Sequence, residues 1–162
     1  MPRKVPAAAA HDHRACLQQA LAEAEHACAA RGLRLTPLRR RVLELIWRGH
    51  SAVKAYDLLE QLQRERAGAA PPTVYRALEF LAQAGLIHRI ESLNAFVGCA
   101  APRQPHRGQF LICRRCENVA ELATDRIGRM LGQAAARSGF KVERQVVEIS
   151  GLCARCATQP AR

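Results

Sequence analysis

Two pairs of cysteines near the C-terminal end are the strongest chemical signal in the sequence. Each pair has a two-residue gap, and the four residues are Cys113, Cys116, Cys153 and Cys156. This gap lets both sulfurs of a turn face one ion, and two such turns supply the four thiolates of a tetrahedral structural zinc site. The intervening residues 117–152 exceed the usual zinc-ribbon spacing, but a strand, a helix and a strand fit between the pairs. The sequence therefore predicts structural zinc, with disulfides, two unrelated redox motifs or an iron–sulfur cluster as alternatives.

A second set of possible metal ligands lies in the same half of the chain. These residues, each of a type that binds divalent ions, are His88, Cys99, His106 and Glu121. Each also has an ordinary interpretation, because a histidine on a strand face is usually satisfied within the protein, and a loop histidine or a surface carboxylate is usually solvated. Residue types and spacing alone therefore leave this second site open.

The chain is basic throughout. Its 162 residues include 25 Lys and Arg against 14 Asp and Glu, a net charge of +11, which favours a polyanionic partner such as nucleic acid or an acidic membrane surface. The longest uncharged run, residues 92–102, is shorter than the roughly 18 to 20 apolar residues of a spanning helix, and the first residues do not resemble a signal peptide. We therefore expect a cytoplasmic protein without membrane association, whose seven cysteines stay reduced and serve metal or redox chemistry. No nucleophile triad, carboxylate pair or phosphate-binding glycine loop is evident, so we expect neither an enzyme nor a small-molecule substrate.

The elements that would position these ligands follow from apolar periodicity. The first half predicts four helices, which end near Gly32, Gly49, Gly68 and Gly85. The period then changes, and two short strands are expected as a winged hairpin over residues 86–91 and 94–99. After a loop at 100–108, the sequence predicts strands at 109–113 and 118–122, a helix that includes residues 127–134, and a last strand at 140–149. The expected fold class is α+β, with a winged helix followed by a small α/β unit.

Four separated motifs resemble the ferric uptake regulator (Fur) family, in the family's order and over residues 15–157. They are the segments LTPLR at 35–39, AYDLL at 55–59 and PTVYRAL at 72–78, followed by the two cysteine pairs. The resemblance implies a winged-helix DNA-binding domain, a hinge, and a dimerising α/β domain that senses metal. The expected limits are a flexible basic arm at 1–14, the DNA-binding domain at 15–92, the hinge and wing region at 93–108, and the zinc-binding dimerisation domain at 109–162.

Within this family the sequence is most similar to the branch that responds to zinc. Iron and peroxide sensors typically carry a histidine-rich run before the first cysteine pair, whereas residues 103–108 contain one histidine. The resemblance implies a regulatory zinc site, and its ligands would be His88, Cys99, His106 and Glu121. Such a mixed donor set suits tetrahedral zinc, since Mn²⁺ prefers oxygen and Fe²⁺ rarely needs a thiolate. Two zinc ions per subunit are therefore expected, one structural and one regulatory.

The fourth helix is the expected recognition helix. With its apolar stripe inward, Thr73, Tyr75 and Arg76 lie on or near the other side. In a major groove, Arg76 can read guanine and the Tyr75 ring can contact a thymine methyl, although a plain surface arginine is the alternative for Arg76. Arg39 and Arg40 are expected to contact phosphates or simply to keep their helix soluble.

The resemblance also implies a function. We expect a zinc-responsive transcriptional repressor that binds palindromic double-stranded operator DNA as a homodimer when zinc is bound, and represses zinc-uptake genes. An iron- or peroxide-sensing regulator of the same fold is one alternative. A zinc-storage or thiol-redox protein is another, because it would use the cysteines without a DNA-reading helix.

Overall fold

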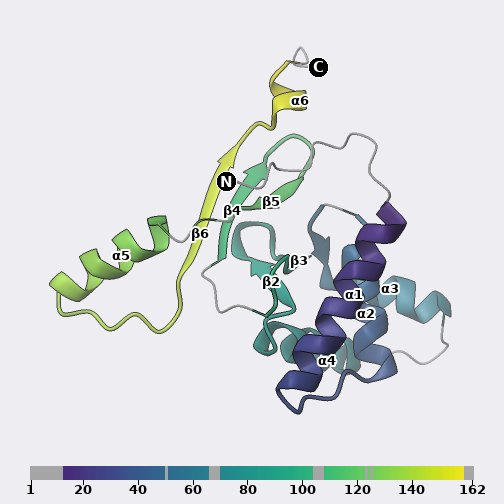
Figure 1. Cartoon of the computed structure of the whole chain (residues 1–162). Helices are drawn as coiled ribbons and strands as arrows, with labels where there is room; N and C mark the ends of the chain where they lie inside the picture. The colour runs from purple at the N-terminus through teal and green to yellow at the C-terminus, as the bar shows by residue number, and fades with distance from the viewer. Residues whose placement is uncertain are drawn as a thin grey trace. The chain divides into compact units, whose positions relative to one another are not determined.

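The computed structural model describes residues 13–49, 51–65, 70–103, 108–122, 124 and 126–158. These residues form two compact units, one within residues 10–105 and one within residues 106–162 (Figure 1). Most of the expected N-terminal arm and the expected ligand His106 lie outside the described residues. Within the described ranges, no helix combines the length and the apolar character needed to cross a membrane.

Four helices of the first unit enclose an aliphatic core. They are α1 (His13–Ala30), α2 (Pro37–Trp47), α3 (Ala55–Glu65) and α4 (Pro71–Gln83). The start of α2 is capped, because the Thr36 hydroxyl accepts a hydrogen bond of 3.4 Å from the backbone N–H of Arg39. Pro37 follows the cap, where its missing N–H costs no helical hydrogen bond. The four predicted helices are confirmed.

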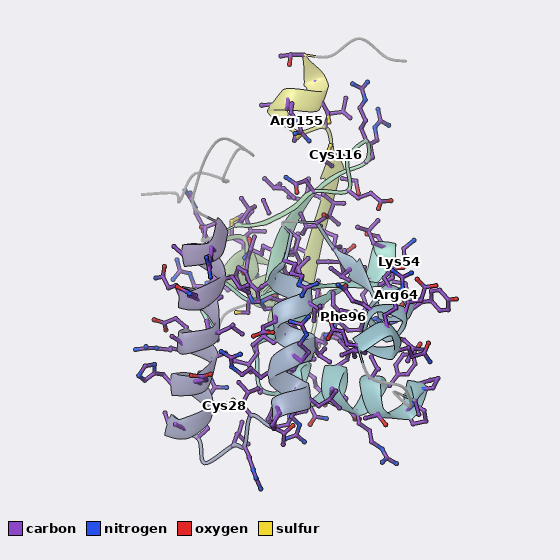
Figure 2. The ribbon with its side chains drawn as sticks, turned by 90° about the vertical axis from the view of Figure 1, so that its right-hand side faces the viewer. Cys28, Lys54, Arg64, Phe96, Cys116 and Arg155 are labelled. Atoms are coloured by element: carbon purple, nitrogen blue, oxygen red, sulfur yellow. The ribbon has the colours of Figure 1, made fainter. Side chains whose placement is uncertain are left out.

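The core of this unit is built from the apolar stripes of its helices. Residues at most 2% exposed include Val42, Leu43, Ile46, Leu58, Leu62, Leu78 and Leu81. Cys28 of α1, labelled in Figure 2, is also buried in this core. Each helix is therefore held by burial of one face, as its periodicity predicts.

A three-stranded antiparallel sheet completes the first unit as a winged helix. Its strands are β1 (Val53–Lys54), β2 (Ile87–Ile90) and β3 (Ala95–Gly98), in the order β1-β3-β2. Between β2 and β3 the chain passes through a 3-10 turn, η1 (Glu91–Leu93), and then Asn94, whose φ of 46° is left-handed. The sequence did not predict β1, because two residues are too short to show an alternation.

Trp47, at the end of α2, packs directly against the backbone of β3. A β-carbon built on Gly98 would lie 2.1 Å from Cε2 of Trp47, far inside van der Waals contact. The absence of a side chain at Gly98, the residue before Cys99, therefore lets the indole ring lie directly against the strand. Phe96, two residues earlier on β3 and labelled in Figure 2, also packs against the core.

The second unit is a three-stranded mixed sheet with two helices. The elements are β4 (Gly108–Cys113), β5 (Val119–Glu121), α5 (Arg126–Arg137), β6 (Val146–Gly151) and α6 (Ala154–Ala157). The strand order is β5-β4-β6, with β4 antiparallel to β5 and parallel to β6. Together the two units confirm the predicted α+β class.

The last strand differs from its prediction at both ends. It was expected over residues 140–149, but β6 begins at Val146 and continues to Gly151. Val146 is also the first residue of β6 that pairs with a described residue of β4, which is Gly108. Residues 140–145 are described and form no strand, and the alternation of apolar and polar residues in the sequence slips at Arg144.

Candidate metal centres and nucleic-acid interface

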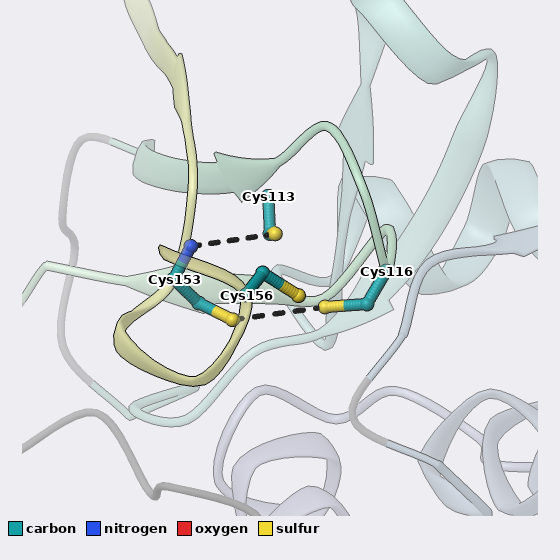
Figure 3. A group of neighbouring side chains, drawn as sticks. All are labelled: Cys113, Cys116, Cys153 and Cys156. Carbon is teal, nitrogen blue, oxygen red and sulfur yellow. Dashed lines mark hydrogen bonds between the residues drawn. The ribbon is translucent and has the colours of Figure 1, made fainter. Parts of the chain in front are cut away.

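The four paired cysteines converge at one end of the second unit's sheet. Cys113 ends β4, Cys116 lies in the following turn, Cys153 caps α6, and Cys156 lies within α6. Parallel pairing of β4 with β6 places Cys113 opposite Gly151, so that both turns leave the sheet at the same end. All four sulfurs lie within 4.8 Å of one another and face a common centre (Figure 3).

The spacing of these sulfurs fits a tetrahedral zinc ion. The Sγ atoms of Cys116 and Cys153 are 3.8 Å apart. Zinc–sulfur bonds of about 2.3 Å, directed to the corners of a tetrahedron, place neighbouring sulfurs about 3.8 Å apart. A disulfide would need a distance of about 2.05 Å, and all seven cysteines are free thiols. The four residues could therefore hold one structural zinc ion.

Backbone groups and burial act on these thiols in opposite directions. Hydrogen bonds from backbone N–H groups, first that of Cys153 at 3.3 Å and then that of Cys116, lower the pKa of Cys113 to about 5. Burial, together with the neighbouring thiols, raises the pKa of Cys156 to about 12. Without a cation the cluster therefore favours a mixture of thiolate and thiol, because four adjacent negative charges repel one another. A dication would offset that repulsion and allow all four sulfurs to bind as thiolates.

Two arginines also contact this cluster. The side chain of Arg155 bonds to Cys116, which raises the pKa of the guanidinium. Nη1 of Arg115 donates a hydrogen bond of 2.6 Å to the backbone carbonyl of Cys156. These cations would reduce the surplus negative charge of a zinc ion with four thiolate ligands.

His88 and Cys99 form a second pair of candidate ligands, within the winged-helix unit. His88 of β2 pairs with Val97 of β3, and Cys99 follows two positions later on the same face of the hairpin. The backbone N–H of Cys99 donates a hydrogen bond of 2.9 Å to the carbonyl of Leu86, which continues the ladder beyond β3. A ring nitrogen of His88 and the sulfur of Cys99 lie within 4.8 Å of each other. Cys99 is buried and His88 is half-buried, so this pair could hold a metal through one nitrogen and one sulfur.

The other two expected ligands belong to the second half of the chain. Glu121 is half-buried at the end of β5, opposite Phe110 of β4. His106 lies outside the described residues.

Helix α4 presents one polar face, as its periodicity predicts. Its buried residues are Val74, Ala77, Leu78 and Leu81. Thr73, Tyr75 and Arg76 are all exposed, and Tyr75 retains 59% of its surface. An exposed arginine and an exposed aromatic ring on one helix can reach base edges in a DNA groove.

Arg39 and Arg40 both have intramolecular partners. The guanidinium carbon of Arg39 lies 3.5 Å from the ring centroid of Phe80, a cation–π contact that joins α2 to α4. Arg40 donates hydrogen bonds to Glu25 at 2.9 Å and to Glu44 at 2.5 Å. Because exposed ion pairs contribute little stability, a phosphate group could compete for Arg40.

Tyr56 is an exposed side chain that the sequence analysis did not single out. It lies in the first turn of α3 with 67% of its surface exposed, two positions after the exposed Lys54 of β1, which is labelled in Figure 2. The sequence could have indicated this exposure, because Tyr56 lies outside the apolar stripe formed by Leu58 and Leu62. An exposed aromatic ring and an exposed cation two positions apart extend the surface that could meet nucleic acid.

Comparison with known proteins places this arrangement in a family. The model of the ferric uptake regulator family matches residues 30–150. The zinc uptake regulation protein of Escherichia coli is 44% identical over 140 residues, which cover 86% of this chain and 82% of that protein.

Two solved structures are similar over both units. A zinc uptake regulator complexed with zinc and DNA has 43% identity and a TM-score of 0.82, with 87% of this chain and 95% of that chain covered. The holo form of XcZur has 45% identity and a TM-score of 0.80, with 86% and 97% covered. Because the family model and these relatives span most of the sequence, the chain belongs to the ferric uptake regulator family.

Proposed function

We propose that this protein is a zinc-responsive transcriptional repressor, which binds palindromic operator DNA as a homodimer when zinc is bound and represses zinc-uptake genes. The observation that carries the proposal is the proximity of His88 and Cys99, whose donor atoms lie within 4.8 Å of each other within the winged-helix unit. A nitrogen and a sulfur donor suit zinc better than Mn²⁺. The similarity to regulators of zinc uptake supports the same metal. The protein is a regulator and not an enzyme.

The proposal assigns two zinc ions to each subunit. The four thiolates of the paired cysteines would hold the structural ion, and the regulatory ion would be held by His88, Cys99, His106 and Glu121. When bound, the regulatory zinc would supply a dication whose charge the Cys99 thiolate and the Glu121 carboxylate neutralise. Because these ligands come from both units of the chain, the binding free energy would favour one orientation of the two units over others.

That orientation is what DNA binding would require. In this proposal residues 15–92 read DNA, residues 93–108 form the hinge and wing region, residues 109–162 dimerise, and the basic arm at 1–14 precedes them. Two recognition helices of a dimer must reach successive major grooves, about 34 Å apart. A chain that samples many hinge orientations satisfies this spacing rarely. Because the target is chromosomal DNA, we place the protein in the cytoplasm.

The residues of α4 would read the operator. Thr73, Tyr75 and Arg76 would contact base edges, with Arg76 placed to bind guanine through two hydrogen bonds. Arg39 and Arg40 at the start of α2 would contact phosphates, which adds affinity without sequence choice.

The metal dependence of DNA binding separates this proposal from its alternatives. An iron- or peroxide-sensing regulator would respond to Fe²⁺ rather than to zinc. A zinc-storage or thiol-redox protein would bind zinc without any effect on DNA affinity.

The test is a serine substitution at one ligand of each proposed site. Fluorescence anisotropy with operator DNA, selected from genomic fragments in the presence of zinc, would measure affinity with and without added zinc. We expect Cys99→Ser to lower the zinc-dependent gain in affinity by about tenfold or more, because a hydroxyl is a poor zinc ligand. Cys113→Ser should instead impair folding or dimerisation.

The matched control is Cys16→Ser, which changes a cysteine of α1 outside both clusters. We expect it to behave as the wild-type protein. If Cys99→Ser keeps the full zinc response, the proposed regulatory site is wrong. If Cys113→Ser gives a stable folded dimer, the structural role of the paired cysteines is wrong.

A further inference from the structure

One arginine connects the recognition helix to the chain segment that follows Cys99. Arg31 comes directly after α1, and its two terminal nitrogens bind different parts of the unit. Nη1 donates a hydrogen bond of 2.7 Å to the carbonyl of Ala84, which caps the C-terminal end of α4. Nη2 donates a hydrogen bond of 2.5 Å to the carbonyl of Pro102. A single side chain thus joins α1, α4 and the segment three residues beyond Cys99.

A second contact fastens the same segment to α1. Arg103, next to Pro102, forms an ion pair of 2.5 Å with Glu23 of α1. Pro102 itself is buried, whereas the residues on both sides of it are exposed. Residues 102 and 103 are therefore held against α1 at two adjacent points, close to a proposed metal ligand in the sequence.

The chemistry of the Arg31 contact suits a positioning role. The last carbonyls of a helix have no intrahelical partner and lie at the negative end of the helix dipole. A guanidinium is planar and presents several N–H donors in fixed directions, so that it can bind two separate carbonyls at once. A lysine has one compact ammonium on a flexible chain and does not reproduce this rigid fork.

We propose that Arg31 is a positioning residue that couples the metal site to the recognition helix. It binds both the C-terminal end of α4 and the carbonyl of Pro102. When zinc fixes the position of Cys99 and of the residues that follow it, these two hydrogen bonds fix the position of α4 as well. This inference rests on the proposed function, in which zinc bound at His88 and Cys99 controls DNA affinity. Without Arg31, zinc still binds its ligands, but the position of α4 follows the metal site less closely.

The quantity that measures this coupling is the ratio of DNA affinities with and without zinc. We expect Arg31→Gln to lower that ratio by about tenfold. Arg31→Lys, which keeps the charge but not the fork, should lower it nearly as much. Glu23→Gln, which removes only the ion pair with Arg103, should lower it less.

A matched control separates positioning from simple loss of charge. Arg64→Gln removes one exposed positive charge from α3. Arg64, labelled in Figure 2, forms one ion pair among the described residues, with Glu60 at 3.5 Å. Losing a charge weakens DNA binding equally with and without zinc, so the ratio should stay unchanged.

Zinc binding without DNA provides the second readout. Trp47 is the only tryptophan in the sequence and packs at Gly98, beside Cys99, so its fluorescence should change when zinc binds there. We expect Arg31→Gln to show this change at a zinc concentration within about threefold of that for wild type. Circular dichroism would establish that the variant is folded.

The outcomes distinguish the inference from the proposed function. An unchanged affinity ratio in folded Arg31→Gln overturns the positioning role and leaves the zinc response standing. A wild-type protein whose DNA affinity ignores zinc overturns the proposed function and this inference with it. A lowered ratio in Arg31→Gln with an unchanged ratio in Arg64→Gln supports the positioning role.

Discussion

Glu117 shows how one residue in the turn after the first cysteine pair can work against the fold. It follows Cys116, its φ is 53°, and its backbone N–H donates a hydrogen bond of 2.8 Å to the carbonyl of Cys113. Left-handed backbone costs a residue with a β-carbon about 1 to 2 kcal/mol, whereas glycine adopts it freely. The turn therefore keeps its hydrogen bond at the expense of backbone strain.

Replacing this residue should stabilise the second unit. We expect Glu117→Gly to raise the free energy of unfolding of the zinc-loaded protein by up to about 1 kcal/mol, since the relief of strain is partly offset by the greater chain entropy of unfolded glycine. Urea unfolding measured by circular dichroism checks this.

Asn94→Gly is the comparison for Glu117→Gly, because Asn94 also has a positive φ, of 46°, but asparagine tolerates it. Its gain should be smaller. A destabilised Glu117→Gly would mean that the glutamate side chain makes a contact worth more than the strain.

At the scale of elements, a helix or strand could be predicted from the sequence when its pattern of apolar residues was long enough to show a period. The helices of the winged helix have apolar stripes long enough to show a period of 3.6, and all four were predicted. The two-residue strand β1 and the four-residue helix α6 are too short to show any period. The start of β6 falls where the alternation of the sequence slips, at residues 144–147, so the local pattern does not place it.

The two proposed metal sites also differ in how far a local pattern predicts them. The spacing within the cysteine pairs already determines that two sulfurs of each turn converge. The proximity of His88 and Cys99 instead depends on the register of β2 and β3, and a shift of one residue would move one side chain to the other face. That register depends on η1 and on the left-handed Asn94, whose geometry the sequence does not specify.

The contact between α2 and β3 leads to a prediction about the winged helix as a unit. Gly98→Ala would place a methyl group 2.1 Å from the Trp47 ring, so that the helix and strand must separate or the ring must move. Overpacking of this kind typically costs about 1 to 3 kcal/mol. We expect a loss of that size in the free energy of unfolding, measured by urea denaturation with tryptophan fluorescence.

Gly49→Ala is the matched control, since its added methyl would meet Ser51 at an ordinary 3.6 Å. Its effect should stay within about 0.5 kcal/mol. Equal stability of Gly98→Ala and wild type would show that the indole ring yields without loss of packing.

At the scale of the whole molecule, the net charge of +11 sets the background for DNA binding. Contacts to phosphates release counterions, so the binding constant falls as the salt concentration rises. On duplex DNA, the logarithm of the binding constant falls with the logarithm of salt concentration by about 0.9 for each phosphate neutralised. Such contacts strengthen binding to every sequence. In the proposed function, selectivity would therefore come from the few exposed side chains on α4 that can reach base edges.

Two arginine variants should separate these contributions. Arg40→Ala is expected to weaken binding equally on operator and unrelated DNA, and to reduce the salt exponent by about 1.

Arg76→Ala is expected to lower the preference for operator DNA by about 1 to 3 kcal/mol. Anisotropy titrations on both DNAs at several salt concentrations measure both effects. A uniform loss for Arg76→Ala on all DNA would assign that residue to a phosphate.

Strand β4 brings the proposed zinc response within reach of oxidative stress. It ends at Cys113 in the thiol cluster, and three residues earlier Phe110 pairs with Glu121 of β5. An oxidant that converted the cluster thiolates to disulfides would expel the ion and loosen the ladder of β4 and β5 at the Ile112–Val119 pair, two positions from the pair that holds Glu121. Oxidised cells would then express zinc importers even when zinc is abundant.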